Sequence, residues 1–214
     1  MSFRYFVYIS DSKVDLLLQQ IDPGATRKRT AEVSVDLKVL KGKRGVEAAV
    51  GADRTERLER VVRYLTDFGD LGSVDEPGQF FWGLLPLRWG PLVGADGLSL
   101  VYFGGRDERT VLGLGGSRRH VFGALPAGDL DPPLSRSLLP SLLDGIARGP
   151  GIATAVTGDG DGDAEACQDV RRATTDLRGP AQNMEFIAKR LLHGKTADGE
   201  SVLLGSPLYV ALVD

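Results

Sequence analysis

The sequence lacks the features of an exported or membrane protein. A single cysteine, Cys167, among 214 residues excludes an intramolecular disulfide and a cysteine-rich zinc site. No window comes near the roughly 18 to 20 consecutive apolar residues that a membrane-spanning helix needs. The opening MSFRYFVYISDSK has a short apolar run but no small-residue cleavage site, which is typical of a first strand and not of a signal peptide. We therefore expect a cytoplasmic protein without membrane insertion.

The chain also lacks an excess of basic residues. Lys and Arg total 26 and Asp and Glu total 29, for a net charge of −3. Nucleic-acid-binding domains are normally basic, so general nucleic-acid binding is not expected. The two short basic clusters, 27–29 and 41–44, are typical of solvated loops. Hydrophobic residues make up 42% of the chain, enough for a sizeable core.

Motifs for metal binding and for nucleophilic catalysis are missing as well. His120 and His193 are far apart, and neither lies in an HExxH pattern. Aspartates alternate over residues 159–163 as in an EF-hand loop, but Ala164 and Val170 stand where that loop needs its glycine and its glutamate. No GxSxG elbow is present. The sequence therefore predicts no metal site and gives no local nucleophile.

In the first third of the chain, the hydrophobic pattern alternates between strand and helix periods. A β-rich run at 3–10 is followed by helical spacing over 13–21. Residues 31–40 alternate apolar and polar side chains, which predicts a half-buried strand, with 46–50 as its hairpin partner. A second helix is expected from an acidic cap at Asp53.

The middle of the chain, from about residue 71 to 127, is predicted to be strands and turns. Short β-branched or aromatic runs occupy 98–105 and 110–116, and 119–125 is a further candidate strand. The aromatic segment before them is interrupted by Pro86 and Pro91.

The last third is predicted to be mainly helical. A helix is expected from about residue 134, kinked at Pro140 or beginning there, and a longer helical region covers 164–193 with a break at Gly179–Pro180. The acidic segment at about 157–163 is expected to be a flexible loop. Two short strands close the chain within 201–214, and we expect them to pair near the N-terminal strand. Together these elements predict one α+β domain over residues 1–214, with a mainly antiparallel or mixed sheet and packed helices.

The most unusual segment is VLGLGGSRRHVFG, at residues 111–123. Successive glycines let backbone N–H groups converge on an anion, and neighbouring arginines add charged donors. The predicted ligand-binding residues here are Gly115, Gly116, Ser117, Arg118 and Arg119. The alternative is a hairpin in which the two glycines supply positive φ angles. The segment lacks both the lysine of a phosphate-binding P-loop and the third glycine of a dinucleotide fingerprint.

An aromatic segment supplies the remaining candidate residues. Arg88 and Trp89, with Trp82 nearby, are predicted to form a stacking wall for a planar ligand. The alternative is that these aromatic residues fill the core.

Several segments together resemble a known family. They are YFVYISDSKVDLLLQQI, VDEPGQF, LRWGPL, VYFGG, VLGLGGSRRHVFG, FIAKRLLHG and LLGSPLYVALVD. The chain is similar in these segments, and nearly end to end, to uncharacterised cytosolic actinobacterial proteins grouped as a domain of unknown function. The resemblance implies a single domain, and it implies no catalytic residue and no cofactor.

Three functions follow as hypotheses. The first is a binding module for a small anionic or planar ligand, such as a nucleotide or a phosphorylated metabolite. The second is an enzyme for a phosphorylated or acyl substrate, in which His120 is the acid or base and Asp107 or Glu108 orients it. The third is a subunit that binds a protein partner or a second copy of itself. The identity of any cofactor stays open.

Overall fold

The structure, a computed structural model, describes residues 3–22, 43–94, 97–123, 139–148 and 162–213 of the chain. Contacts group the chain into two compact units, one of residues 11–69 and one of residues 1–10 together with 70–214. Within the described ranges, no helix has both the length and the apolar character needed to cross a membrane.

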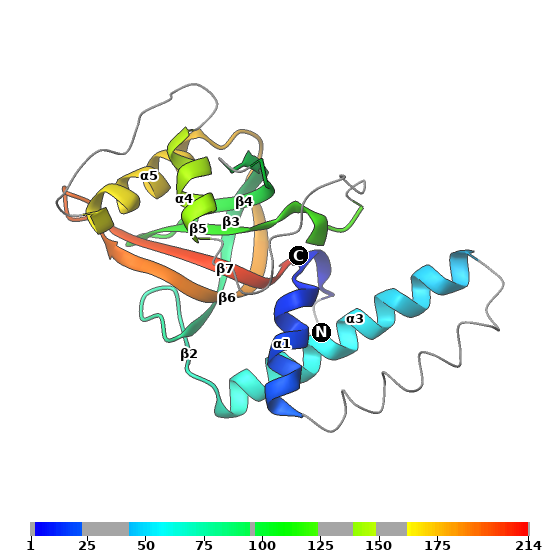
Figure 1. The fold of residues 1–214 in the computed structure, drawn as a ribbon. Coiled ribbons are helices and arrows are strands. Elements are labelled where there is room, and N and C mark those ends of the chain that lie inside the picture. Colours follow the sequence, from blue (N-terminus) through cyan, green and yellow to red (C-terminus); the bar gives the residue numbers. More distant parts are fainter. Residues whose placement is uncertain (1–2, 23–42, 95–96, 124–138, 149–161, 214) are drawn as a thin grey trace. The chain divides into compact units, whose positions relative to one another are not determined.

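In the part of the smaller unit that the structure describes there are two helices, α1 (Asp11–Ile21) and α3 (Lys43–Phe68) (Figure 1). Its apolar contacts come from the helical spacing seen in the sequence, and its buried side chains are Val14, Leu58, Val61 and Leu65. Charged residues join the two helices, since the Arg57 guanidinium lies 2.6 Å from Asp15 Oδ1 and 3.5 Å from Asp11 Oδ1.

Two expectations in this region had different outcomes. The predicted strand at 31–40 lies outside the described residues. The predicted hairpin partner at 46–50 was wrong, because these residues belong to α3, which begins at Lys43 and not at Asp53. A short apolar run does not separate strand from helix, and the alanines and glutamate within it favour helix.

The larger unit is built on a closed five-stranded barrel. Its strands follow the order β3, β4, β5, β7, β6 and back to β3, and every pair is antiparallel except β5 with β7. The strands are β3 (Phe80–Val93), β4 (Ser99–Arg106), β5 (Thr110–Ser117), β6 (Gln182–Lys195) and β7 (Ser201–Leu212) (Figure 1). The predicted α+β class with a mixed sheet is confirmed.

The barrel closes because the long strand β3 has two partners in succession. Residues 80–87 pair with β6, and residues 87–93 pair with β4. The strand continues through Pro86 and Pro91, where the sequence indicated interruptions. Among the described residues, Pro86 has a neighbouring strand on one side only, and strand prolines are accommodated at such positions.

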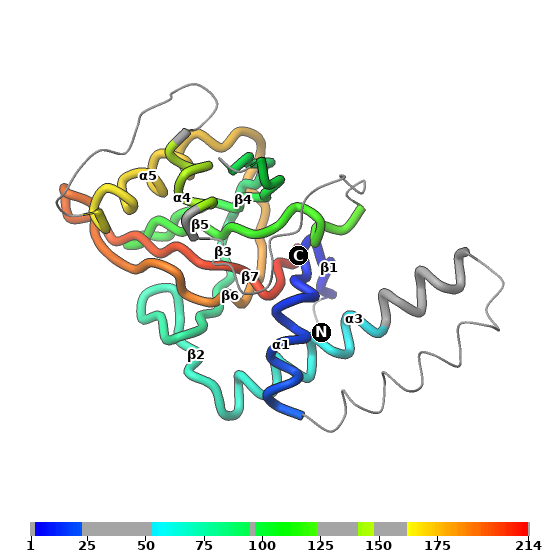
Figure 2. The backbone as a smooth tube through the Cα atoms, in the orientation of Figure 1, coloured from blue at the N-terminus to red at the C-terminus, as the bar shows by residue number. Residues whose placement is uncertain are grey.

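Two short strands extend the sheet. β1 (Tyr5–Ile9) runs antiparallel to the end of β7, and Figure 2 shows β1 beside the C-terminal end of β7. The predicted pairing of the terminal strands is therefore confirmed. β2 (Leu71–Gly72) pairs in parallel with the start of β3.

The C-terminal third differs from its predicted helical character. α5 (Gly162–Asp176) is a helix, but residues 182–195 form strand β6, so the second predicted helix was wrong. Met184, Phe186 and Ala188 alternate into the barrel core, and this tertiary burial outweighs the helical propensity of the segment. β7 is one continuous strand, whereas two short strands were expected, and its register with β6 shifts within the pair.

Helices α4 (Leu139–Arg148) and α5 lie together on one side of the barrel (Figure 1). Pro140 lies in the first turn of α4, which is one of the two positions that the sequence predicted for it. Gly162 and Asp163 belong to α5, and the rest of the expected acidic loop lies outside the described residues.

Two apolar clusters stabilise this unit. One fills the barrel, and it includes Phe81, Phe103, Leu114 and Phe186. The other packs α4 and α5 onto the outer surface of the barrel, and it includes Tyr102, Leu142, Cys167 and Val170. Cys167 is completely buried in this second cluster.

Candidate functional site

The paired glycines of the unusual segment lie inside a strand. Gly115 and Gly116 belong to β5 and stand opposite Tyr102 and Val101 of β4. The hairpin-turn interpretation was wrong, because among the described glycines only Gly97, Gly123, Gly179 and Gly199 have positive φ.

Close packing explains why these two positions are glycine. A Cβ atom on Gly115 would lie 2.2 Å from Cδ1 of Leu142 in α4. A Cβ atom on Gly116 would lie 2.3 Å from the Tyr8 hydroxyl oxygen. The two glycines therefore let Leu142 approach one face of β5 and Tyr8 the other.

The basic residues follow where the strand ends. Ser117 is the last residue of β5, and Arg118, Arg119 and His120 form a single 3₁₀ turn. Both arginines are exposed, whereas His120 is buried, with 5% of its surface accessible. Arg118 makes no side-chain hydrogen bond or ion pair with the described part of the chain, so its charge extends into solvent.

A line of aromatic rings reaches this turn from the neighbouring strands. Trp89 stacks on Phe103, with ring centroids 5.8 Å apart and an interplanar angle of 25°. Tyr8 makes T-shaped contacts with both Phe103 and His120, with ring centroids 6.1 Å and 5.8 Å apart, respectively. We call Trp89, Phe103, Tyr8 and His120 the aromatic cluster.

The aromatic cluster lies at the end of the barrel where β5 finishes and β6 begins. Phe103 and Tyr8 are buried, but Trp89 is 41% exposed because β6 starts only opposite Leu87 and leaves the next inward position uncovered. Trp89 therefore presents part of its indole surface to solvent at this end.

His120 positions one of the two arginines. Arg119 Nε donates a hydrogen bond to His120 Nε2 at 3.3 Å. In this hydrogen bond His120 Nε2 is the acceptor. The Arg119 guanidinium is thereby held against the buried ring.

Arg88 lies next to Trp89 in β3 but on the opposite face of the strand. Successive side chains of a strand point to opposite faces, so Arg88 faces outward where Trp89 faces inward. Arg88 Nε donates to the carbonyl oxygen of Gly179 at 2.9 Å. Arg88 and Trp89 therefore do not form one stacking wall.

The carboxylates expected to orient His120 are also distant from it. Asp107 Oδ1 accepts the backbone N–H groups of Arg109 and Thr110, both at 2.7 Å, and so caps the β4–β5 turn. That turn precedes β5, whereas His120 follows β5. The expectation that Asp107 or Glu108 orients His120 was wrong, because an eight-residue strand lies between them.

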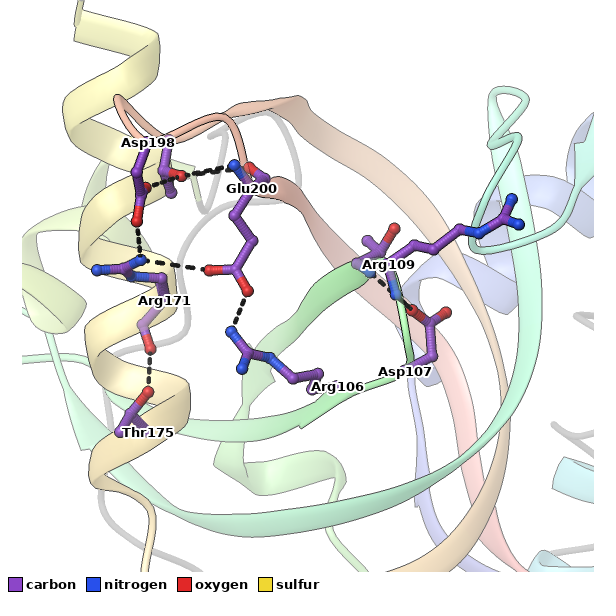
Figure 3. Close-up of polar contacts among 9 residues, drawn as sticks. Arg106, Asp107, Arg109, Arg171, Thr175, Asp198 and Glu200 are labelled. Carbon is purple, nitrogen blue, oxygen red and sulfur yellow. Dashed lines mark hydrogen bonds and ion pairs between the residues drawn. The ribbon is translucent and has the colours of Figure 1, made fainter.

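A cluster of charged side chains lies near the β4–β5 turn, as Figure 3 shows. Arg171 of α5 lies 2.6 Å from Asp198 and 3.4 Å from Glu200 in the β6–β7 turn, and Arg106 of β4 also pairs with Glu200. Hydrogen bonds from Thr196 and Arg171 hold the pKa of Asp198 below its usual value. These cations and carboxylates satisfy one another, so the cluster fastens α5 to the turn.

The other titratable groups give no metal centre in the part of the chain that the structure describes. Within it, no group of three or more His, Cys, Asp and Glu side chains is arranged to hold a metal ion.

Sequence reasoning missed Tyr8 and Phe103, which connect Trp89 to His120. Both belong to strands that the sequence indicated, and the expected pairing of the terminal strands already placed Tyr8 beside the end of β7. The ring contacts themselves depend on barrel closure, which brings together residues far apart in the chain.

Comparisons with known proteins identify a family but no activity. A model of a family of unknown function, DUF7019, matches residues 4–214 and so includes both compact units. No curated protein and no solved structure matches the chain. The chain belongs to the family of unknown function DUF7019.

Proposed function

We propose that the chain is a binding module for a ligand with a planar ring and an anionic group, of which nucleotides are the simplest class. The observation that carries the proposal is the half-exposed Trp89, backed by the stacked Phe103 and joined through Tyr8 to His120 beside two exposed arginines. The predicted ligand-binding residues Trp89, Arg118 and Arg119 remain in this proposal as direct contacts. Gly115, Gly116 and Ser117 support it by shaping β5, and Arg88 is left out.

Trp89 provides the planar contact. An indole already packed against a second ring is held in a fixed orientation, so a ligand ring can stack on its exposed surface with little further loss of side-chain freedom.

The arginines provide the anionic contact. Guanidinium groups bind phosphate and carboxylate with two parallel hydrogen bonds, and Arg119 is already oriented by His120. In a chain with a net charge of −3, two adjacent exposed arginines give this end a local positive charge.

The separation of the two contacts limits the ligand's size. Trp89 of β3 pairs with Phe103 of β4, which in turn pairs with Leu114 of β5, two strands away from β3. Arg118 lies four residues after Leu114 in the chain. Strand geometry then places the Cα atoms of Trp89 and Arg118 roughly 15 Å apart, a distance that the long arginine side chains shorten. A ring joined directly to a carboxylate is too short, whereas a nucleotide with its phosphates spans the distance.

The proposal is tested by measuring the melting temperature with ATP, ADP, NAD and inorganic phosphate at low salt. A ligand at about 100 times its Kd stabilises the folded state by about 2.7 kcal/mol. We expect a nucleotide to raise the melting temperature of the unmodified chain and not that of the variant Arg118→Ala/Arg119→Ala.

The matched control is the variant Arg109→Ala/Arg172→Ala, which removes the same charge at exposed positions in the β4–β5 turn and on α5. It should keep the ligand-induced shift. A shift that persists in the Arg118/Arg119 variant, or the absence of a shift with every compound, contradicts the proposal.

A further inference from the structure

The inward face of β3 stays exposed where the strand extends beyond β6. Past Leu87, β3 pairs with β4 on one side and, among the described residues, with no strand on the other. Trp89, Pro91 and Val93 stand at alternate positions of this part of β3, so their side chains share one face. All three are exposed, Trp89 by 41% and Val93 by 63%, and we call them the open row.

The open row leads to the exposed arginines. Val93 pairs with Ser99 of β4, and the neighbouring Leu100 pairs with Ser117 of β5, directly before Arg118. The 3₁₀ turn that begins at Arg118 also contacts β4. The open row covers about 13 Å of extended strand, and two strand spacings of about 5 Å separate it from the end of β5. The stacking surface and the cations therefore lie at the two ends of one path.

No carboxylate belongs to the segments that form this path, which are residues 88–93, 98–104 and 114–123. Arg118 and Arg119 are its exposed cations at the far end. Asp144 and Asp176 belong to α4 and α5, which pack on the outer surface of the barrel, and Asp96 lies outside the described residues. The net charge of −3 argues against binding an anion over the whole surface, but this path itself is basic.

We propose that the ligand of this path is a single-stranded nucleic acid, a step that rests on the proposed function. One base stacks on Trp89, the following bases lie along the open row, and phosphates of the strand meet Arg118 and Arg119. A stacked strand advances about 3.4 Å per nucleotide. Several nucleotides therefore fit along the path, whereas a free nucleotide contacts only its two ends.

The openness of the path favours a strand over a free nucleotide. Sites for small ligands bury about 70–90% of the ligand surface. A base on Trp89 would instead be covered on one face, because no described strand flanks β3 there. Each base stacked on an aromatic side chain raises the affinity by about 5- to 150-fold. A strand adds apolar contacts with Pro91 and Val93, while the free motion of the ligand is lost only once.

The test compares oligomers with mononucleotides of the same base. Fluorescence anisotropy measures the Kd of labelled oligothymidylate and oligouridylate of about 12 nucleotides, a length within the usual site size of single-strand binders, and dTMP and UMP compete. We expect the better oligomer, which tells DNA from RNA, to bind at least about 100-fold more tightly than its mononucleotide, beyond the gain from its overlapping sites. A duplex of the same length should bind more weakly, because its bases are already stacked and paired.

A substitution on the open row tests the path itself. Val93→Glu places a carboxylate beside the strand and should weaken the oligomer by about tenfold or more. The matched control is Leu84→Glu, on the outward face of the same strand, where the side chain is 53% exposed, and it should bind the oligomer normally. Both changes are at exposed positions, so the fold should persist, which the melting temperature verifies.

Salt dependence tests the phosphate contacts. Arg118→Ala/Arg119→Ala should reduce the slope of log Kd against log salt concentration by about 1.4, the value for two phosphates of a single strand. Arg109→Ala/Arg172→Ala should leave the slope unchanged.

Three results would overturn the proposal and leave the proposed function in place: an oligomer that binds no more tightly than its mononucleotide, an unchanged affinity in Val93→Glu, or an unchanged salt slope in the Arg118/Arg119 variant. If neither the oligomers nor any nucleotide binds, the proposed function fails as well.

Discussion

Gly104 and Gly113 stand opposite each other on β4 and β5, where α5 crosses the barrel. A Cβ atom on Gly104 would lie 3.0 Å from Thr174 Oγ1, and one on Gly113 would lie 2.4 Å from the Tyr102 hydroxyl. That hydroxyl bonds to Thr174 Oγ1 at 2.8 Å. The missing side chains thus allow a buried polar contact between sheet and helix.

Gly113→Ala should destabilise the fold by about 1–3 kcal/mol, because the added methyl group collides with a tyrosine fixed by its hydrogen bonds. The control Gly90→Ala lies in β3, where a Cβ atom would make only an ordinary 3.6 Å contact, and it should not lower stability. Urea denaturation measures both changes. Equal effects at the two glycines would contradict the packing explanation.

Tyr102 also predicts a loss of stability at alkaline pH. Burial raises the pKa of Tyr102 above the ordinary tyrosine value of 10.0, although the hydrogen bond with Thr174 opposes this. Below about pH 10, Tyr102 is neutral in both the folded and the unfolded state. As the pH rises above it, the unfolded state releases a proton that the folded state retains, so the free energy of unfolding falls.

Tyr102→Phe removes this proton and should make the alkaline decrease shallower, although it lowers stability at neutral pH by about 1 kcal/mol. The measurement is the free energy of unfolding in urea on both sides of about pH 10, the ordinary pKa of tyrosine. Parallel pH profiles for the two proteins would contradict the assignment. Tyr209 should contribute a similar decrease in both proteins, because burial raises its pKa as well.

At the scale of elements, apolar contacts hold both α4 and α5 to the barrel. α5 is also held by the charged cluster of Arg106, Arg171, Asp198 and Glu200. The two contributions are unequal. Leu142 of α4 is buried, whereas the arginines of the charged cluster are 31% and 57% exposed at their side chains. Exposed ion pairs contribute little because water and salt screen them.

Leu142→Ala should therefore cost about 2–5 kcal/mol, as expected for a cavity in an apolar cluster. Glu200→Gln should cost less than about 1 kcal/mol, and its effect should decrease as salt is added. Chemical denaturation at two salt concentrations separates these cases. A larger cost for Glu200→Gln would show that the charges, and not the apolar contacts, hold the helices.

Elements with a clear local pattern were predictable from the sequence. The β-rich runs predicted β1, β4 and β5. For Pro140 the sequence predicted either a kink within the helix or a place in its first turn, and the structure shows the second. β6 was not predictable in this way, because its segment contains strong helix formers and its alternation matters only once the barrel encloses Met184 and Phe186. Closure of the barrel depends on β3 changing partners at Leu87, which no local pattern indicates.

The candidate site shows the same division. The sequence singled out Trp89, Arg118, Arg119 and His120 by composition, and the structure places them at one end of the barrel. The sequence did not reveal on which face of β3 the Arg88 side chain lies, nor that the paired glycines allow close packing. Both depend on which strands are neighbours, and so on contacts between distant parts of the chain.

At the scale of the whole molecule, the barrel unit has surfaces of different character. The end of the barrel with the aromatic cluster combines an exposed indole with exposed arginines, and it carries the proposed ligand site. Near the other end, Arg106 and Arg171 form ion pairs with Asp198 and Glu200.

The most direct measurement is the fluorescence of Trp89 in the variant Trp82→Phe, where it is the only tryptophan of the chain. The variant is titrated with the nucleotide that gives the largest thermal shift. A ring that stacks on the exposed indole should quench its emission in a saturable way, with the same Kd as the thermal shift, and Arg118→Ala/Arg119→Ala should weaken that Kd. Unchanged Trp89 emission at a ligand concentration that stabilises the protein would contradict the account, because the ligand would then bind elsewhere.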